Sequence, residues 1–214
     1  MKILVVGANG QIGQKVVKKL AGNNHEVLAM IRDKSQQDNV AGKNVKPVIA
    51  DLEQDISSAF KDNLDAVAFT AGSGGHTGPE KTRAIDLQGA KKTIDEAVKN
   101  NVRRYIMVSA LGTNNAENAS EDMRPYFVAK SEADQHLVQS SLDYTILRPG
   151  RLTDESGTGQ INAGPSIDTG DTVEITRTDV ATTIAEVLDK PNTYKKVIEM
   201  VNGKTPIPDA VQNI

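Results

Sequence analysis

The chain has no cysteine among its 214 residues. It therefore cannot form a disulfide framework, bind zinc through thiolates or use a cysteine nucleophile. Long apolar runs are missing too, and none approaches the roughly 20 residues that a membrane-spanning helix requires. The N-terminus enters an apolar run at Ile3 without the pattern of a secretion signal. We expect a protein that contacts no membrane and remains in the cytoplasm.

An excess of charge of one sign is also lacking. The 25 basic and 28 acidic residues leave a formal net charge of -3, and both signs are mixed along the chain. No basic surface for nucleic acid is expected from this balance. The three histidines, His25, His76 and His136, are scattered without the spacing of metal ligands. We therefore expect neither a nucleic-acid partner nor a metal site. His76 falls in an expected loop where it could touch substrate, but a solvent-exposed loop histidine is the favoured interpretation.

Short apolar runs alternate with stretches of helical pattern. The expected strands cover residues 3–6, 27–31, 45–49, 66–69, 105–108 and 144–147, and the expected helices between them cover 11–21, 34–40, 57–60, 79–99 and 123–140. Such alternation is typical of βαβ units in a parallel sheet. The pattern predicts an α/β fold with a doubly wound parallel sheet, which is the Rossmann fold.

The length of the chain fits one domain over residues 1–214. After Pro149 the composition changes, and glycine, threonine and aspartate dominate residues 152–172. We expect residues 151–176 to form a small C-terminal lobe, an excursion on the substrate side of the sheet. A helix over 178–188 and a strand over 196–201 are expected to close the chain.

The first apolar run leads directly into a glycine-rich turn and a helix. Gly7 lets the chain turn sharply, Gly10 lets backbone approach a phosphate, and Gly13 lets the helix pack closely on the strand. Bare N–H groups at a helix N-terminus suit a dinucleotide pyrophosphate, although an ordinary strand-to-helix turn is the alternative. The expected cofactor-binding residues of this turn are Gly7, Asn9, Gly10, Gln11, Ile12 and Gly13.

The residue that ends the second expected strand bears on the choice of dinucleotide. An acid there binds the ribose 2′-OH of NAD, whereas a cation accommodates the 2′-phosphate of NADP. Arg32 comes first and Asp33 follows it. We therefore expect NADP, with NAD as the alternative. In an interpretation without cofactor contact, Arg32 is a solvated loop cation and Asp33 caps a helix.

Two further strand ends are expected to touch the cofactor. After the third strand, Asp51 can accept from the adenine amino group and Leu52 can cover the ring, unless Asp51 only caps a helix. After the fourth strand, the small residues Ala71, Gly72 and Ser73 let the backbone run alongside the cofactor, unless this loop is merely flexible.

Tyr126 and Lys130 provide the most specific chemical signal. Side chains four apart share one face of a helix, and an ammonium near a phenol favours the phenolate, which can exchange a proton with a carbonyl or alcohol. Ser109 ends the fifth strand, where its hydroxyl can polarise the same oxygen. A chance surface pair is the alternative interpretation of Tyr126 and Lys130.

These motifs resemble those of short-chain dehydrogenases/reductases. The similarity is to their atypical branch, which includes epimerase/dehydratase-like, NmrA-like and biliverdin reductase B-like proteins. It rests on the glycine turn, on Ser109, Tyr126 and Lys130, and on the segment that contains Pro149. The resemblance implies that the tyrosine is the acid/base, that the lysine binds the nicotinamide ribose and lowers the tyrosine pKa, and that the serine orients substrate. It also implies that Pro149 contacts the cofactor.

One position departs from the pattern of typical members. Asp86 stands where they carry an asparagine, and we count it with the catalytic residues, although it could equally be a solvent-facing helix acid. The sequence therefore predicts an NADP-dependent oxidoreductase acting on a small carbonyl or alcohol. The alternatives are an epimerase or dehydratase that uses NAD on a sugar, and a non-catalytic NADP-sensing regulator of the NmrA-like kind.

Overall fold

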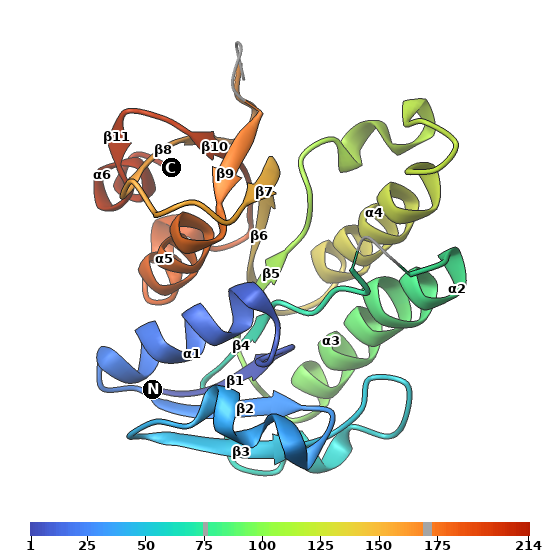
Figure 1. Ribbon diagram of the computed structural model, residues 1–214, viewed down its shortest axis with the longest axis vertical. Coiled ribbons are helices and arrows are strands. Elements are labelled where there is room, and N and C mark those ends of the chain that lie inside the picture. Colours follow the sequence, from blue (N-terminus) through green and yellow to red (C-terminus); the bar gives the residue numbers. More distant parts are fainter. Residues whose placement is uncertain (75–76, 169–172) are drawn as a thin grey trace.

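The computed structural model describes residues 1–74, 77–168 and 173–214. Its centre is a nine-stranded sheet in the order β11-β8-β10-β6-β5-β4-β1-β2-β3 (Figure 1). The strands are β1 (Lys2–Val6), β2 (Glu26–Ile31), β3 (Val45–Ile49), β4 (Ala66–Phe69), β5 (Arg104–Val108), β6 (Asp143–Pro149), β8 (Gln160–Gly164), β10 (Lys196–Asn202) and β11 (Thr205–Pro206). The seven strands from β3 to β10 are parallel, whereas β8 runs antiparallel to both β10 and β11.

Helices cover both faces of this sheet (Figure 1). On one face lie α1 (Gln11–Gly22), α5 (Arg177–Val187) and α6 (Ile207–Gln212), and on the other lie α2 (Pro79–Thr82), η3 (Arg83–Gly89), α3 (Ala90–Lys99) and α4 (Arg124–Val138). Short 3-10 turns complete the connections: η1 (Lys34–Val40), η2 (Ser57–Phe60), η4 (Thr113–Asn118) and η5 (Pro191–Thr193).

The strands of the centre are apolar on both faces because helices bury both. In β1, Ile3 and Val5 belong to the core beneath α1 and α5, while Leu4 and Val6 belong to the core beneath α3 and α4. After β3 the chain crosses to the other side of β1 and continues with β4. The carboxyl ends of β1 and β4 therefore lie at the switch point where ligands bind in such sheets.

The doubly wound α/β fold is confirmed, and each of the six expected strands is present. The helices expected over 34–40 and 57–60 are 3-10 turns instead. Both crossovers are too short to bury an amphipathic stripe of several turns. The helix expected over 79–99 is continuous, but its middle, η3, is π-helical.

The C-terminal part differs more from expectation. Within the proposed excursion 151–176, β8 joins the main sheet beside β10, so residues 160–164 belong to the core and not to a separate lobe. Only β7 (Arg151–Thr153) and β9 (Glu174–Thr176) form a small sheet of their own. Nor does β10 close the chain, because β11 and α6 follow it. The strands β7, β8, β9 and β11 are too short to show a clear apolar period in the sequence.

The turn between β1 and α1 is tightly packed. Gly7 has a φ of +78°, and a Cβ there would lie 2.6 Å from Ala71 Cα, so the loops after β1 and β4 touch. A Cβ on Gly13 would lie 2.2 Å from the Gly7 carbonyl oxygen and 2.8 Å from Ala8 Cα. The two glycines thus have the roles that their spacing predicts, in the turn and in helix packing.

We expect Gly13→Ala to lower the free energy of unfolding by about 2–3 kcal/mol, because backbone must move to admit the methyl group. Gly22→Ala, at the other end of the same helix, is the matched control, since a methyl group there would meet no atom within 4 Å. The control should be neutral or slightly stabilising. Urea unfolding of the two variants measures both effects, and equal stabilities would contradict the close packing.

Candidate functional site

A cavity of about 90 Å³ opens at the carboxyl ends of β1, β2 and β3. It is lined by Gly7, Met30, Arg32, Ala50, Asp51, Leu52 and Ile85. Four of these residues, Gly7, Arg32, Asp51 and Leu52, are ones that the sequence predicts to bind the cofactor. Met30, Ala50 and Ile85 were not predicted, since apolar residues give no sequence signal that separates a cavity wall from the core.

Asp33 and Arg32 have different surroundings. The Asp33 carboxylate accepts a hydrogen bond from Ser35 N at 2.7 Å and caps η1, and the Ser35 hydrogen bonds lower the pKa of Asp33. Gln36 completes the capping box by accepting from Arg32 N and Asp33 N. Asp33 is thus a cap, while the Arg32 side chain borders the cavity.

Asp51 does not cap a helix, because the next helical turn begins at Ser57. Its Oδ1 accepts from Glu53 N at 3.0 Å, which closes the turn after β3, and the same residue lines the cavity. Leu52 is buried next to it and packs against η3, where a Cβ on Gly89 would lie 3.1 Å from Leu52 Cδ1.

The start of α1 faces the same region. Gly10 is the N-cap, and the N–H groups of the first turn have no carbonyl partner inside the helix. Asn9 is held on both sides, because its carbonyl accepts from Gln14 Nε2 at 2.8 Å and its side chain accepts from Asn39 Nδ2 at 2.9 Å. At the helix start, Gln11 is exposed and Ile12 is buried. The arrangement suits a pyrophosphate.

The loop after β4 is held by specific contacts from Ala71 to Ser73. Ala71 lies against Gly7, Ser73 N donates to Asp86 Oδ2 at 2.9 Å, and the Ser73 and Thr82 hydroxyls are 3.2 Å apart. A flexible loop is therefore the wrong description of these residues. Gly72 is equally constrained, since a Cβ there would lie 3.3 Å from Asp86 Oδ1. His76 lies outside the described residues.

Asp86 and Lys130 form a buried ion pair. Lys130 Nζ lies 3.0 Å from Asp86 Oδ1, and the two side chains are 6% and 0% exposed. The interpretation of Asp86 as a solvent-facing acid is wrong. The π-helical segment η3 carries this carboxylate to a place where it contacts both the β4 loop and α4. The sequence pattern gave no sign of the altered helix.

Lys130 connects this pair to Tyr126 and Ser109. Its Nζ lies 5.8 Å from the centre of the Tyr126 ring and donates to the carbonyl of Val108, the residue before Ser109, at 3.3 Å. Burial by itself lowers the pKa of Lys130, but the neighbouring Tyr126 and Asp86 outweigh it and the pKa is raised. The lysine therefore stays a cation at neutral pH.

Ser109 is buried, and its hydroxyl has no hydrogen-bond partner among the residues with described positions. Pro149 is also buried, at the end of β6, where its carbonyl accepts from Leu111 N at 2.8 Å. The predicted residues are thus connected by successive contacts, from the cavity through the β4 loop to Asp86, Lys130 and Tyr126.

Two further charged residues adjoin Ser109. Asp134 is buried on α4, and Arg148, at the end of β6, donates from Nε to Asp134 Oδ2 at 3.0 Å. No role was predicted for either. The signal that could have shown Asp134 is its position four residues after Lys130, on the same helix face.

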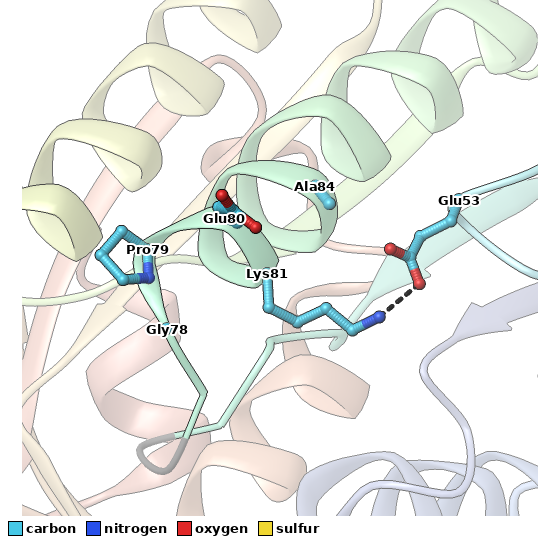
Figure 2. A pocket seen from close by; sticks show the side chains of 6 residues that line it. All are labelled: Glu53, Gly78, Pro79, Glu80, Lys81 and Ala84. Atoms are coloured by element: carbon cyan, nitrogen blue, oxygen red, sulfur yellow. Dashed lines mark hydrogen bonds and ion pairs between the residues drawn. The ribbon is translucent and has the colours of Figure 1, made fainter.

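A second pocket lies outside the first cavity. It has a volume of about 770 Å³ and is lined by Glu53, Gly78, Pro79, Glu80, Lys81 and Ala84 (Figure 2). The Lys81 side chain reaches across to pair with Glu53 (Figure 2). Both side chains are partly exposed, so this pair contributes little stability. Its lining includes Glu53 and Ala84, which are the sequence neighbours of Leu52 and Ile85 in the first cavity, and does not include Tyr126.

Over the described ranges 1–74, 77–168 and 173–214, no group of three or more histidine, aspartate or glutamate side chains is placed to hold a metal ion. Within the same ranges, none of the helices has the length and apolarity to cross a membrane.

The fold, the glycine turn and the cavity at the switch point define a dinucleotide-binding Rossmann protein. A family model described as NAD(P)H-binding matches residues 7–191. The chain belongs to this NAD(P)H-binding family, and its resemblance to the atypical short-chain dehydrogenases/reductases is confirmed.

Individual relatives are similar over the full length. The chain is 43% identical to an uncharacterised sugar epimerase, YhfK, of Bacillus subtilis, with 100% of both chains covered. Among solved structures, a putative NAD-dependent epimerase/dehydratase from Bacillus halodurans is 45% identical with a TM-score of 0.95, covering 100% of both chains. The oxidoreductase ylbE from Lactococcus lactis is 33% identical with a TM-score of 0.87, covering 100% of this chain and 96% of that one.

We expect Lys130→Met to lower the free energy of unfolding by about 3–5 kcal/mol, because it leaves the Asp86 carboxylate buried without a cation. Lys130→Met combined with Asp86→Asn should recover most of this loss, since the amide oxygen still accepts from Ser73. The control is Lys46→Met, which breaks an exposed pair with Asp62 and should cost less than about 1 kcal/mol. Denaturant unfolding compares the three, and a double variant as unstable as the single one would contradict the pairing.

The same pair predicts a dependence on alkaline pH. A lysine whose pKa is raised in the folded state stabilises it fully below the ordinary lysine pKa, and this contribution is lost as pH rises through the raised value. The free energy of unfolding of the wild type minus that of the Lys130→Met/Asp86→Asn variant should stay constant up to about pH 10 and fall above it. Unfolding curves at a series of pH values measure this difference, and a difference that grows with pH would refute the assignment.

Proposed function

We propose that the protein is an NADP-dependent oxidoreductase that acts on a small carbonyl or alcohol. The observation that carries the proposal is the buried Lys130, which pairs with Asp86 and lies near the Tyr126 ring. Contacts through the β4 loop connect these groups to the cavity proposed to hold the nucleotide. Burying two charges costs free energy of hydration. Charged groups with perturbed pKa values are common at catalytic sites, which favours catalysis over simple binding.

The cavity supports NADP as the cofactor. Asp33, which would bind the 2′-OH of NAD, is engaged as the cap of η1, and Arg32 borders the cavity next to it. A guanidinium there is suited to a 2′-phosphate, which it can bind through two parallel hydrogen bonds.

A dinucleotide held by the glycine turn and Arg32 would supply nicotinamide as the hydride donor or acceptor. Tyr126 donates its proton to the carbonyl oxygen in reduction and removes it from the alcohol in oxidation. Lys130 remains protonated beside the Tyr126 ring, while Asp86 fixes where the ammonium lies. Ser109, whose hydroxyl is not otherwise engaged, polarises the same substrate oxygen.

The substrate side supports a small substrate. Of the residues proposed to form it, 151–176, the stretch 160–164 is taken up by β8 in the main sheet, which leaves little chain to cover a large substrate. We propose that the remaining residues, around β7 and β9, border the substrate.

Arg32→Glu should weaken NADPH binding tenfold or more and NADH binding by less than about threefold, because only NADPH carries the phosphate that Arg32 contacts. Lys43→Glu makes the same change of charge on an exposed residue just before β3, at the end of that strand away from the cavity, and should leave both affinities unchanged. Fluorescence titration measures the dissociation constants. Equal losses for both cofactors in Arg32→Glu would refute the assignment of the 2′-phosphate.

Tyr126→Phe should reduce turnover about 100-fold or more and leave the NADPH dissociation constant nearly unchanged, because only the proton donor is removed. A spectrophotometric screen of small carbonyl compounds with NADPH supplies the assay. If the wild type binds NADPH and turns over no compound in the screen, the non-catalytic regulator becomes the better interpretation.

An epimerase or dehydratase acting on a sugar is a second candidate. It is favoured by the names of two full-length relatives that are 43% and 45% identical to the chain. The same Tyr126 and Lys130 would serve such a reaction, but the nicotinamide would be reduced and reoxidised within one turnover. Net consumption of added NADPH with a carbonyl compound supports the oxidoreductase, whereas rearrangement of a sugar nucleotide without net change in the cofactor supports the epimerase.

A further inference from the structure

Asp134 lies on the face of α4 that carries the proposed catalytic groups. Tyr126, Lys130 and Asp134 are four residues apart in turn, so their side chains follow one another along the helix toward β5 and β6. Asp134 is only 2% exposed. A carboxylate this deeply buried needs partners to offset the loss of hydration.

One oxygen of Asp134 holds two elements. Oδ2 accepts from Arg148 Nε at 3.0 Å and lies equally close to Nη2, and it also accepts from the Thr113 hydroxyl at 3.3 Å. Burial raises the pKa of Asp134 above its usual value, and the Arg148 guanidinium opposes this rise. Asp134 thereby joins α4 to the end of β6 and to the segment that follows Ser109.

The other carboxylate oxygen of Asp134 is buried without a hydrogen-bond partner of its own among the described residues. Asp134 Oδ1 and the Ser109 hydroxyl are both buried, and neither has a well-formed hydrogen bond to any residue placed by the structure. Ser109 N donates to the carbonyl of Leu147 at 2.7 Å, which places Ser109 next to Arg148, the partner of Asp134. The nearby Ser109 hydroxyl also lowers the pKa of Asp134. A hydroxyl in this position has one acceptor nearby and is free to rotate toward another.

We propose that Asp134 is a positioning residue for Ser109. Asp134 Oδ1 is the acceptor toward which the Ser109 hydroxyl turns, and a ligand oxygen beside Tyr126 then competes for that hydrogen. Arg148 and Thr113 fix the carboxylate so that only Oδ1 faces the serine. The catalytic meaning of this contact rests on the proposed oxidoreductase function, but the contact itself does not.

The lack of cysteine in the chain permits a direct test. Ser109→Cys introduces a single thiol, and the ultraviolet absorbance of its thiolate reports its ionisation, with the parent protein as the baseline for tyrosine absorbance. Adding Asp134→Asn should raise the ionisation constant of this thiol at least about tenfold, because a carboxylate beside a thiol disfavours the thiolate. Lys130 and Arg148 are the other charged groups near this position, and both are unchanged in the comparison.

Ser109→Cys with Asp95→Asn is the matched control. Asp95 is an aspartate on α3 that pairs with His136 at the surface, so its removal should leave the thiol ionisation within about twofold. An ionisation constant that is the same in the Asp134→Asn variant and in this control would overturn the proposal.

If the Asp134→Asn variant does not fold, the contact is measured from its other side. The carboxyl carbon resonance of Asp134 is titrated in the wild type and in Ser109→Ala, which removes only one buried hydroxyl. Loss of the hydroxyl should move the midpoint for Asp134 to higher pH, and an unmoved midpoint refutes the contact. Neither titration requires turnover, so an inactive enzyme would count against the proposed function and not against the role of Asp134.

Discussion

The ion pair between Lys130 and Asp86 is the contact on which the site depends. Its two charges lie in the interior, so they are tolerated only because each has a second partner: Ser73 N donates to Asp86, and the Val108 carbonyl accepts from Lys130. Those partners belong to the segments after β4 and at the end of β5. One buried pair thus sets the relation of the β4 loop, η3, α4 and β5, and the remaining groups of the site are arranged around it.

The π-helical segment gives this pair its geometry. A π-helix inside an α-helix is uncommon and occurs often at functional sites, because the extra residue per turn changes the direction of the side chains. In η3 it places Asp86 toward α4, while Ile85 borders the cavity at the carboxyl ends of β1, β2 and β3. A single helix therefore contributes both to the proposed cofactor site and to the proposed catalytic groups.

Much of the fold could be predicted from the sequence because its elements obey local rules. Alternating apolar runs and helical stripes gave the central strands and α1, and the spacing of Gly7 and Gly13 gave the close contact of β1 with α1. The antiparallel strand β8 could not be predicted in this way. It has only five residues, and its place in the sheet depends on pairing with β10 about forty residues later.

The sequence by itself determined the residue types of the site, namely the glycine turn, Arg32 and the Tyr126/Lys130 spacing, because each depends on neighbours within a few residues. Only the tertiary structure decided their partners. It showed that Asp33 is committed as a cap, that Asp86 is buried against Lys130, and that Asp134 and Arg148 adjoin Ser109. The physical reason is that burial and charge pairing arise from segments far apart in the chain, and no local pattern records which of them meet.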